Sequence, residues 1–119
     1  MGQNQVLGRQ GEEAAVRFLE EKGFSILERN YRAGRSEVDI IAMDGKMLVI
    51  CEVKTRNWGT QNDGAASVGN KKHKTLMRAA IRYMEDKKLQ CELRFDLLCV
   101  THYRGEWSVE HFEDVFLPY

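Results

Sequence analysis

Three charged residues, Asp39, Glu52 and Lys54, stand where the sequence otherwise predicts buried strands. Residues 40–42 end one apolar run, residues 47–51 begin the next, and an Asp-Gly turn dipeptide lies between them. Apolar residues at successive positions are typical of strands covered on both faces. Ionised groups are costly in such a place unless they are paired or bind a metal, so these three residues are candidates for chemistry.

A hairpin folded at the Asp-Gly dipeptide brings these charges together. Side chains two apart on a strand share a face, so Glu52 and Lys54 point the same way. The fold-back places Asp39 beside the second strand, near residues 51–53. Two carboxylates at this spacing can share one hard divalent cation such as Mg²⁺, which takes oxygen ligands. The lysine can orient a water or help to deprotonate it.

This arrangement, Asp39 followed by Glu52-Val53-Lys54, resembles the active-site signature of the PD-(D/E)xK nuclease superfamily. The chain as a whole resembles the YraN family (uncharacterised protein family 0102), small bacterial proteins with a restriction-endonuclease-like fold. The isolated motif is weak, whereas the ordered set of similar segments is specific. Those segments are Gly8 to Leu19, Glu37 to Ala42, Glu52 to Arg56, Ala65 to Lys74, and Arg94 to Asp96.

The resemblance implies an α/β fold with a mixed central sheet flanked by helices, in the order α-β-β-β-α-β-β. It implies that Asp39, Glu52 and Glu12 bind Mg²⁺ or Mn²⁺, and that Lys54 completes the catalytic set. Glu12 would reach the site from the first helix, and Glu13 does not align with it. Without the resemblance, Glu12 is a solvated first-turn glutamate favoured by the helix dipole. Glu37 shares the face of Asp39, either as an accessory ligand, as a partner for an arginine such as Arg35, or as a solvent-facing residue.

Three functions follow from these residues. The first is a metal-dependent endonuclease that hydrolyses phosphodiester bonds in nucleic acid. DNA is the expected substrate, with branched or repair intermediates suggested by a similarity to archaeal Holliday junction resolvases, and a resolvase would act as a C₂ homodimer. The second is a non-catalytic nucleic-acid-binding module, and the third is a structural or interaction protein whose buried charges pair with one another.

Candidate nucleic-acid contacts follow the hairpin. Lys71, Lys72 and Lys74 lie near the start of a helix predicted over residues 67–87, where basic side chains and unpaired backbone N–H groups can hold a phosphate. Arg56 and Trp58 lie between the hairpin and this helix, and the tryptophan could stack on a base. The alternatives are a solvated basic face and a tryptophan folded back on the core.

Composition limits the remaining possibilities. The 119 residues form one expected domain, and a formal net charge of zero argues against an indiscriminate, strongly basic nucleic-acid binder. The three cysteines form no C-x-x-C pair, so we expect reduced core residues in a cytoplasmic protein. We expect no signal peptide, and the sequence contains no apolar run long enough to span a membrane and no Cys/His arrangement of a zinc site.

The remaining elements carry these residues. Apolar spacing predicts a first helix over about residues 8–22 and a first strand over residues 24–32. After the second helix, residues 93–100 are predicted to form a strand, and the alternation of Trp107, Val109 and His111 predicts another. Arg94 and Asp96 share a face of the former strand, where a structural ion pair is the expectation.

Overall fold

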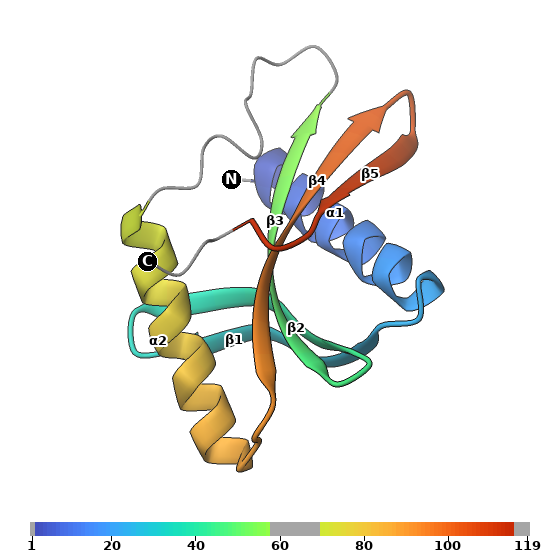
Figure 1. Ribbon diagram of the computed structural model, residues 1–119. Coiled ribbons are helices and arrows are strands. Elements are labelled where there is room, and N and C mark those ends of the chain that lie inside the picture. The colour runs from blue at the N-terminus through green and yellow to red at the C-terminus, as the bar shows by residue number, and fades with distance from the viewer. Residues whose placement is uncertain (1, 58–69, 116–119) are drawn as a thin grey trace.

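The computed structural model describes residues 2–57 and 70–115, and the side chains of residues 7–57 and 74–115. Its elements follow the predicted order (Figure 1). They are α1 (Gly2–Glu21), β1 (Ser25–Ala33), β2 (Ser36–Asp44), β3 (Met47–Asn57), α2 (Asn70–Lys87), β4 (Glu92–Tyr103) and β5 (Glu106–Phe112). The predicted mixed α/β architecture is therefore confirmed.

The strands form one five-stranded sheet in the order β1-β2-β3-β4-β5. All neighbouring strands are antiparallel except β3 and β4, which are parallel and are joined through α2. A parallel pair needs such a crossover, because the chain must return to the same end of the sheet before it pairs again. The two helices lie on opposite sides of the sheet (Figure 1).

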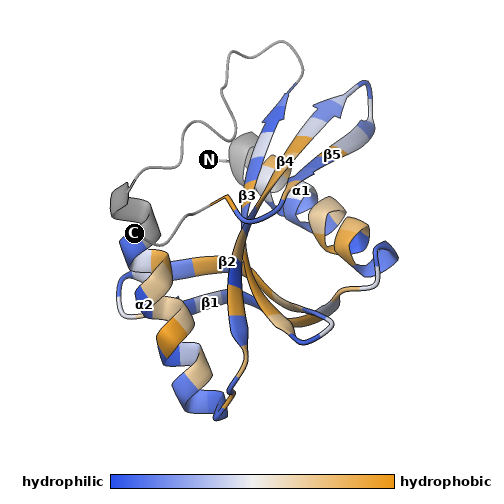
Figure 2. Cartoon of the chain, in the orientation of Figure 1, coloured by the Kyte–Doolittle hydropathy of each residue, from blue (hydrophilic) through white to orange (hydrophobic). Residues whose placement is uncertain are grey.

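Each helix closes its own hydrophobic core. Ala15, Val16 and Leu19 of α1 pack on one face of the sheet, and Leu76 and Ala79 of α2 pack on the other. β2 and β3 supply side chains to both cores, which explains why these strands are apolar at successive positions. Figure 2 shows the resulting hydrophobic middle of the sheet and the more hydrophilic strand ends.

The first helix is longer than the sequence analysis predicts. It begins at Gly2 rather than near Gly8, and ends at Glu21. Residues 2–7 contain no proline or other strong helix breaker, so the helix continues through Gly8 despite the modest cost of an interior glycine. The last two strands are longer too, because β4 and β5 pair continuously from Leu97–Phe112 to Tyr103–Glu106.

The sheet divides at one end, and this fork is where the site lies. β2 pairs with β3 from Asp44–Met47 as far as Ile40–Cys51. Before Ile40, β2 pairs with β1, while β3 continues beside β4 to Asn57. The two halves of the sheet consequently separate, as Figure 1 shows for the upper part of β3 and the paired strands β1 and β2.

Candidate active site

Asp39 lies at the fork and caps the edge of β3. The backbone N–H of Val53 donates a 2.8 Å hydrogen bond to Asp39 Oδ2. This carboxylate supplies the acceptor for a strand-edge N–H at the point where the two strands separate. The predicted approach of Asp39 to residues 51–53 is confirmed, and the contact fixes the position of the carboxylate.

Glu12 reaches the same region from α1. The preceding residue, Gly11, is buried against β3, and a Cβ atom there would lie 2.7 Å from Thr55 Cγ2 and closer still to Thr55 Oγ1. Only glycine permits so close an approach of helix to strand without a shift. The absence of a side chain at Gly11 therefore brings Glu12 over the fork.

Glu12 is held by two residues of β1. Asn30 Nδ2 donates to Glu12 Oε1 at 3.0 Å, and Arg29 Nη2 approaches the same oxygen at 3.5 Å while pairing with Glu13 at 3.0 Å. Burial raises the pKa of Glu12, and the negative charge of Asp39 raises it further, although Asn30 and Arg29 oppose both effects. Burial and a second carboxylate nearby therefore make ionisation of Glu12 less favourable than that of a free glutamate.

A hollow of about 780 Å³ opens beside these carboxylates. We call it the acidic hollow, after the three acids in its lining. The lining residues are Gly8, Arg9, Glu12, Asn30, Arg32, Glu37, Asp39, Val53 and Thr55. Within the described residues, no group of three or more Asp, Glu, His or Cys side chains is close enough to hold a metal ion by itself. The acidic hollow can therefore offer a cation the carboxylates of Glu12 and Asp39, with waters or a ligand completing the shell.

Glu52 and Lys54 stand on the other face of β3. Side chains alternate along a strand, so these two point away from Val53 and Thr55, which line the acidic hollow. Glu52 is buried, with 7% of its surface exposed, and Lys54 is half-buried. The structure thus brings together Asp39 and Glu12, whereas the inclusion of Glu52 and Lys54 in one patch with them stays a prediction.

The other expected site residues lie in four different situations. Glu37 lines the acidic hollow and pairs at 3.7 Å with Arg32, which agrees with the suggested arginine partner, although Arg35 was the example given. Arg56 is half-buried, and its Nε donates to Thr101 Oγ1 at 3.2 Å. Lys74 is exposed on α2. Trp58 and the side chains of Lys71 and Lys72 lie outside the described residues.

A second set of charges surrounds the fully buried Asp96, which lies beside Cys51 in the β3–β4 register. Arg94 donates to both oxygens of Asp96 at 2.9 Å, His111 Nε2 contacts Oδ2 at 2.7 Å, and the Asp114 amide donates to Oδ1 at 3.0 Å. Lys22 Nζ lies 2.8 Å from His111 Nδ1, and since an ammonium only donates, His111 accepts there and donates from Nε2. We call these residues the Asp96 cluster; they confirm the expected Arg94–Asp96 ion pair.

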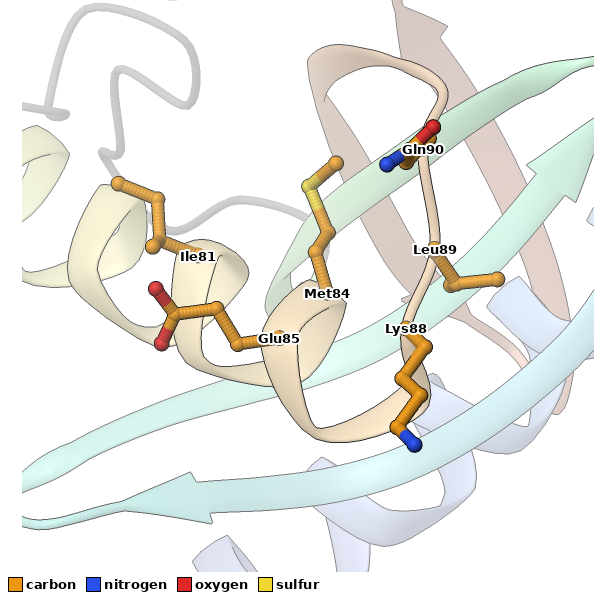
Figure 3. A pocket seen from close by; sticks show the side chains of 6 residues that line it. All are labelled: Ile81, Met84, Glu85, Lys88, Leu89 and Gln90. Carbon is orange, nitrogen blue, oxygen red and sulfur yellow. The ribbon is translucent and has the colours of Figure 1, made fainter.

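A further hollow, of about 580 Å³, lies at the end of α2 (Figure 3). Ile81, Met84 and Leu89 give it an apolar surface, and Glu85 and Lys88 supply opposite charges. Among its described lining residues, Glu85 is the single carboxylate, whereas the acidic hollow has three. Its lining therefore offers no comparable site for a cation.

Sequence reasoning missed the residues of β1 that surround Glu12. Asn30 is an unusual residue for a strand, because asparagine is depleted there, and this was the available signal. Arg9 and Arg32 also line the acidic hollow, and their places depend on the packing of α1 against the sheet. No spacing rule predicts these contacts, since Asn30 and Glu12 belong to different elements.

Among the described residues, no helix is long and apolar enough to cross a membrane.

Comparison with known proteins identifies relatives over almost the whole chain. The model of "Uncharacterised protein family UPF0102" matches residues 11–100. A UPF0102 protein of Flavobacterium psychrophilum is 41% identical over 119 residues, covering 98% of this chain and 98% of the relative. A UPF0102 protein of Anaeromyxobacter dehalogenans is 42% identical, covering 94% of this chain and 84% of the relative. The chain therefore belongs to family UPF0102, the YraN family that its sequence motifs had indicated.

Proposed function

We propose that this protein is a metal-dependent endonuclease that hydrolyses phosphodiester bonds in nucleic acid, with DNA as the substrate. The observation that carries the proposal is the pairing of Asp39, fixed by the Val53 amide at the sheet fork, with Glu12, whose pKa is raised beside it. Perturbed acids that line a hollow are typical of functional sites. The resemblance to the PD-(D/E)xK superfamily supplies the reaction class.

The residues present fit a hard divalent cation. Glu12 and Asp39 offer only oxygen donors. Burial and the charge of Asp39 raise the pKa of Glu12, and a bound cation would lower it again. Mg²⁺ commonly takes one or two carboxylates together with waters and substrate phosphates. When bound, such an ion neutralises phosphate charge and makes a coordinated water more acidic.

The protein's own groups position the reactants. The Val53 amide holds Asp39, while Asn30 and Arg29 hold Glu12. Arg9 and Arg32, which line the acidic hollow, are placed to contact a phosphodiester backbone that enters it. The hollow thereby combines an acidic floor for a cation with guanidinium groups for the substrate.

Glu52 and Lys54 enter the proposal through the resemblance, as a further ligand and as the group that stabilises developing charge. Glu52 directly precedes Val53, whose amide binds Asp39, so its backbone lies at the same fork. Because the two side chains stand on the opposite face of β3 from the acidic hollow, variants at Glu12 and Glu52 report which face the reaction uses.

A cleavage assay tests the function. Labelled single-stranded, duplex, flap and four-way-junction DNA would be incubated with the protein and Mg²⁺, Mn²⁺ or EDTA. We expect metal-dependent products that disappear in Asp39→Asn and Glu12→Gln but persist in Glu13→Gln. Glu13 is a matched control, since it adjoins Glu12 and shares Arg29, yet does not line the hollow.

Each alternative result has a meaning. Salt-dependent DNA binding without turnover under any metal would identify a non-catalytic binding module. Loss of activity in Glu52→Gln with full activity in Glu12→Gln would move the reaction to the other face of β3. If the protein shows no cleavage, no metal binding and no nucleic-acid binding, the proposed function is rejected.

A further inference from the structure

Asn30 has a backbone conformation that is uncommon for its position. Its φ angle is +54°, in the left-handed region, although it lies inside β1. The other non-glycine residues with positive φ in the described chain, Lys88, Arg104 and Asp114, lie outside helices and strands. Left-handed conformations are unfavourable in strands, so they persist where the surrounding structure requires them.

The irregularity at Asn30 faces Asp39. Arg29 pairs with Ile40 and Tyr31 pairs with Val38, so Asn30 and Asp39 are opposite one another in the β1–β2 register. At this position β2 also changes the alternation of its side chains. Val38 and Ile41 belong to the α2 core and Ile40 to the α1 core. Both strands therefore depart from regular geometry where the acidic hollow begins.

The conformation of Asn30 has a direct chemical result. Its amide nitrogen donates to Glu12 Oε1 at 3.0 Å. A carboxylate can only accept, so the asparagine presents its NH₂ group to Glu12. Unlike an arginine or lysine, this donor adds no positive charge, and it orients Glu12 without neutralising it. Arg29, 3.5 Å from the same oxygen, offsets that charge only in part.

We propose that Asn30 is a positioning residue, whose left-handed backbone directs its side-chain amide to Glu12 and fixes that carboxylate beside Asp39. The significance for catalysis rests on the proposed nuclease function. The hydrogen bond between Asn30 and Glu12 does not depend on that function, because it is present in the protein without metal or nucleic acid. Asparagine suits the position, since it tolerates the left-handed region better than most residues and carries a neutral donor.

The first test measures proton exchange of the Asn30 side-chain amide by NMR in the metal-free protein. We expect slow exchange in the wild type, rapid exchange in Glu12→Ala, and slow exchange again in Glu13→Ala. The matched controls differ only in which neighbouring glutamate is removed. An amide that exchanges rapidly in the wild type, or that is indifferent to Glu12→Ala, would overturn the proposal.

The second test uses Asn30→Gly, which keeps the left-handed backbone accessible and removes the side chain that carries the donor. We expect Mn²⁺ affinity measured by calorimetry to fall about 10–100-fold, as for other residues that orient metal ligands, with kcat falling on the best substrate. Arg104→Gly, a change at another left-handed residue with φ +50°, should leave Mn²⁺ affinity unchanged. Equal affinity in Asn30→Gly and the wild type would contradict the proposed role.

The two tests separate the two proposals. If the wild type neither binds Mn²⁺ nor cleaves DNA, the nuclease function fails, and the amide exchange still decides whether Asn30 positions Glu12. If the wild type cleaves DNA and Asn30→Gly cleaves equally well with equal Mn²⁺ affinity, the nuclease function stands and the role of Asn30 is rejected.

Discussion

The acidic hollow and the Asp96 cluster both contain carboxylates, but they treat the negative charge in opposite ways. Asp96 is fully buried and receives hydrogen bonds from Arg94, His111 and the Asp114 amide. Burial alone would raise its pKa, but these bonds outweigh burial and lower it. Glu12 is less buried, yet burial and the charge of Asp39 raise its pKa.

The difference separates a structural role from the proposed functional one. In the Asp96 cluster, charge and donors are matched, and the contacts tie together β4, β5 and the segment that contains Asp114. In the acidic hollow, Asn30 and Arg29 offset the accumulated charge only in part. Negative charge that is only partly offset is suited to a cation, whereas loss of one partner from a matched buried cluster destabilises the fold.

The largest expected effect is on stability, at Asp96. Asp96→Asn should lower the free energy of unfolding by about 3–5 kcal/mol, because it leaves Arg94 without its principal buried partner. Denaturant unfolding measures the change. Asp86→Asn is the control, since its exposed pair with Arg82 should contribute no more than about 0.5 kcal/mol. Similar losses in the two variants would mean that the Asp96 cluster is not structural.

Substitution of an acid in the acidic hollow should lower cleavage activity rather than stability. Asp39→Asn should reduce the rate of cleavage by about 10²–10³-fold, because it removes charge at the proposed metal site. Its unfolding free energy should change by less than about 1 kcal/mol, because the asparagine oxygen can still accept from the Val53 N–H. Parallel cleavage and denaturation measurements compare the two. A loss of stability as large as that of Asp96→Asn would remove the contrast between the regions.

The next effect concerns how α1 carries Glu12 to the fork. Gly11→Ala should destabilise the protein by about 1–3 kcal/mol, because the added methyl group meets the side chain of Thr55. Gly8→Ala is a matched control in the same helix with no atom within 4 Å of its added Cβ, and should stabilise by about 0.5–1 kcal/mol. Thermal unfolding of both variants tests the prediction, and equal shifts would show that α1 does not depend on this approach.

The smallest effects are in pH dependence, where the two regions should have opposite signs. The lowered pKa of Asp96 gives stability that is present above its unfolded pKa and is lost as pH falls through the folded value. The raised pKa of Glu12 makes stability fall as pH rises from its unfolded pKa through its folded one. Glu12→Gln should therefore stabilise the protein at neutral pH, by less than about 1 kcal/mol.

Denaturation curves collected from pH 2 to pH 8 would separate these contributions. The acid-induced loss of stability should be smaller in Asp96→Asn than in the wild type. The gain in Glu12→Gln should disappear at low pH, where the wild-type glutamate is protonated. A Glu12→Gln gain that is independent of pH would point to altered packing instead of removed charge.

The hairpin at the centre of the chain was predictable in detail. Asp-Gly marked its turn, the apolar runs marked its strands, and their register placed Asp39 beside Val53. The Arg94–Asp96 pair was equally accessible, since two residues on one strand face are neighbours by strand geometry alone. The resemblance added Glu12, which the structure places beside Asp39 in the same hollow.

The remaining contacts of the acidic hollow and the Asp96 cluster could not be predicted from the sequence. No local sequence pattern connects Asn30 with Glu12, and an asparagine in a strand does not by itself predict a left-handed backbone. His111 follows an alternating strand pattern, yet its partners are Lys22 and Asp96, from two other parts of the chain. Glu12 and Glu52 lie on opposite faces of β3, and this too depends on which face of the sheet α1 covers.

By itself, the sequence determined the elements, their order, and the hairpin that carries Asp39, because periodicity and turn chemistry act between residues close in the chain. Only the tertiary structure decided that α1 comes close enough to β3 at Gly11 to put Glu12 beside Asp39. It also decided that the charge of Asp96 is matched by Arg94 and His111, while the charge of the acidic hollow is offset only in part. Such outcomes depend on packing between distant segments, where the shape of a whole core, rather than any local pattern, sets which charges meet.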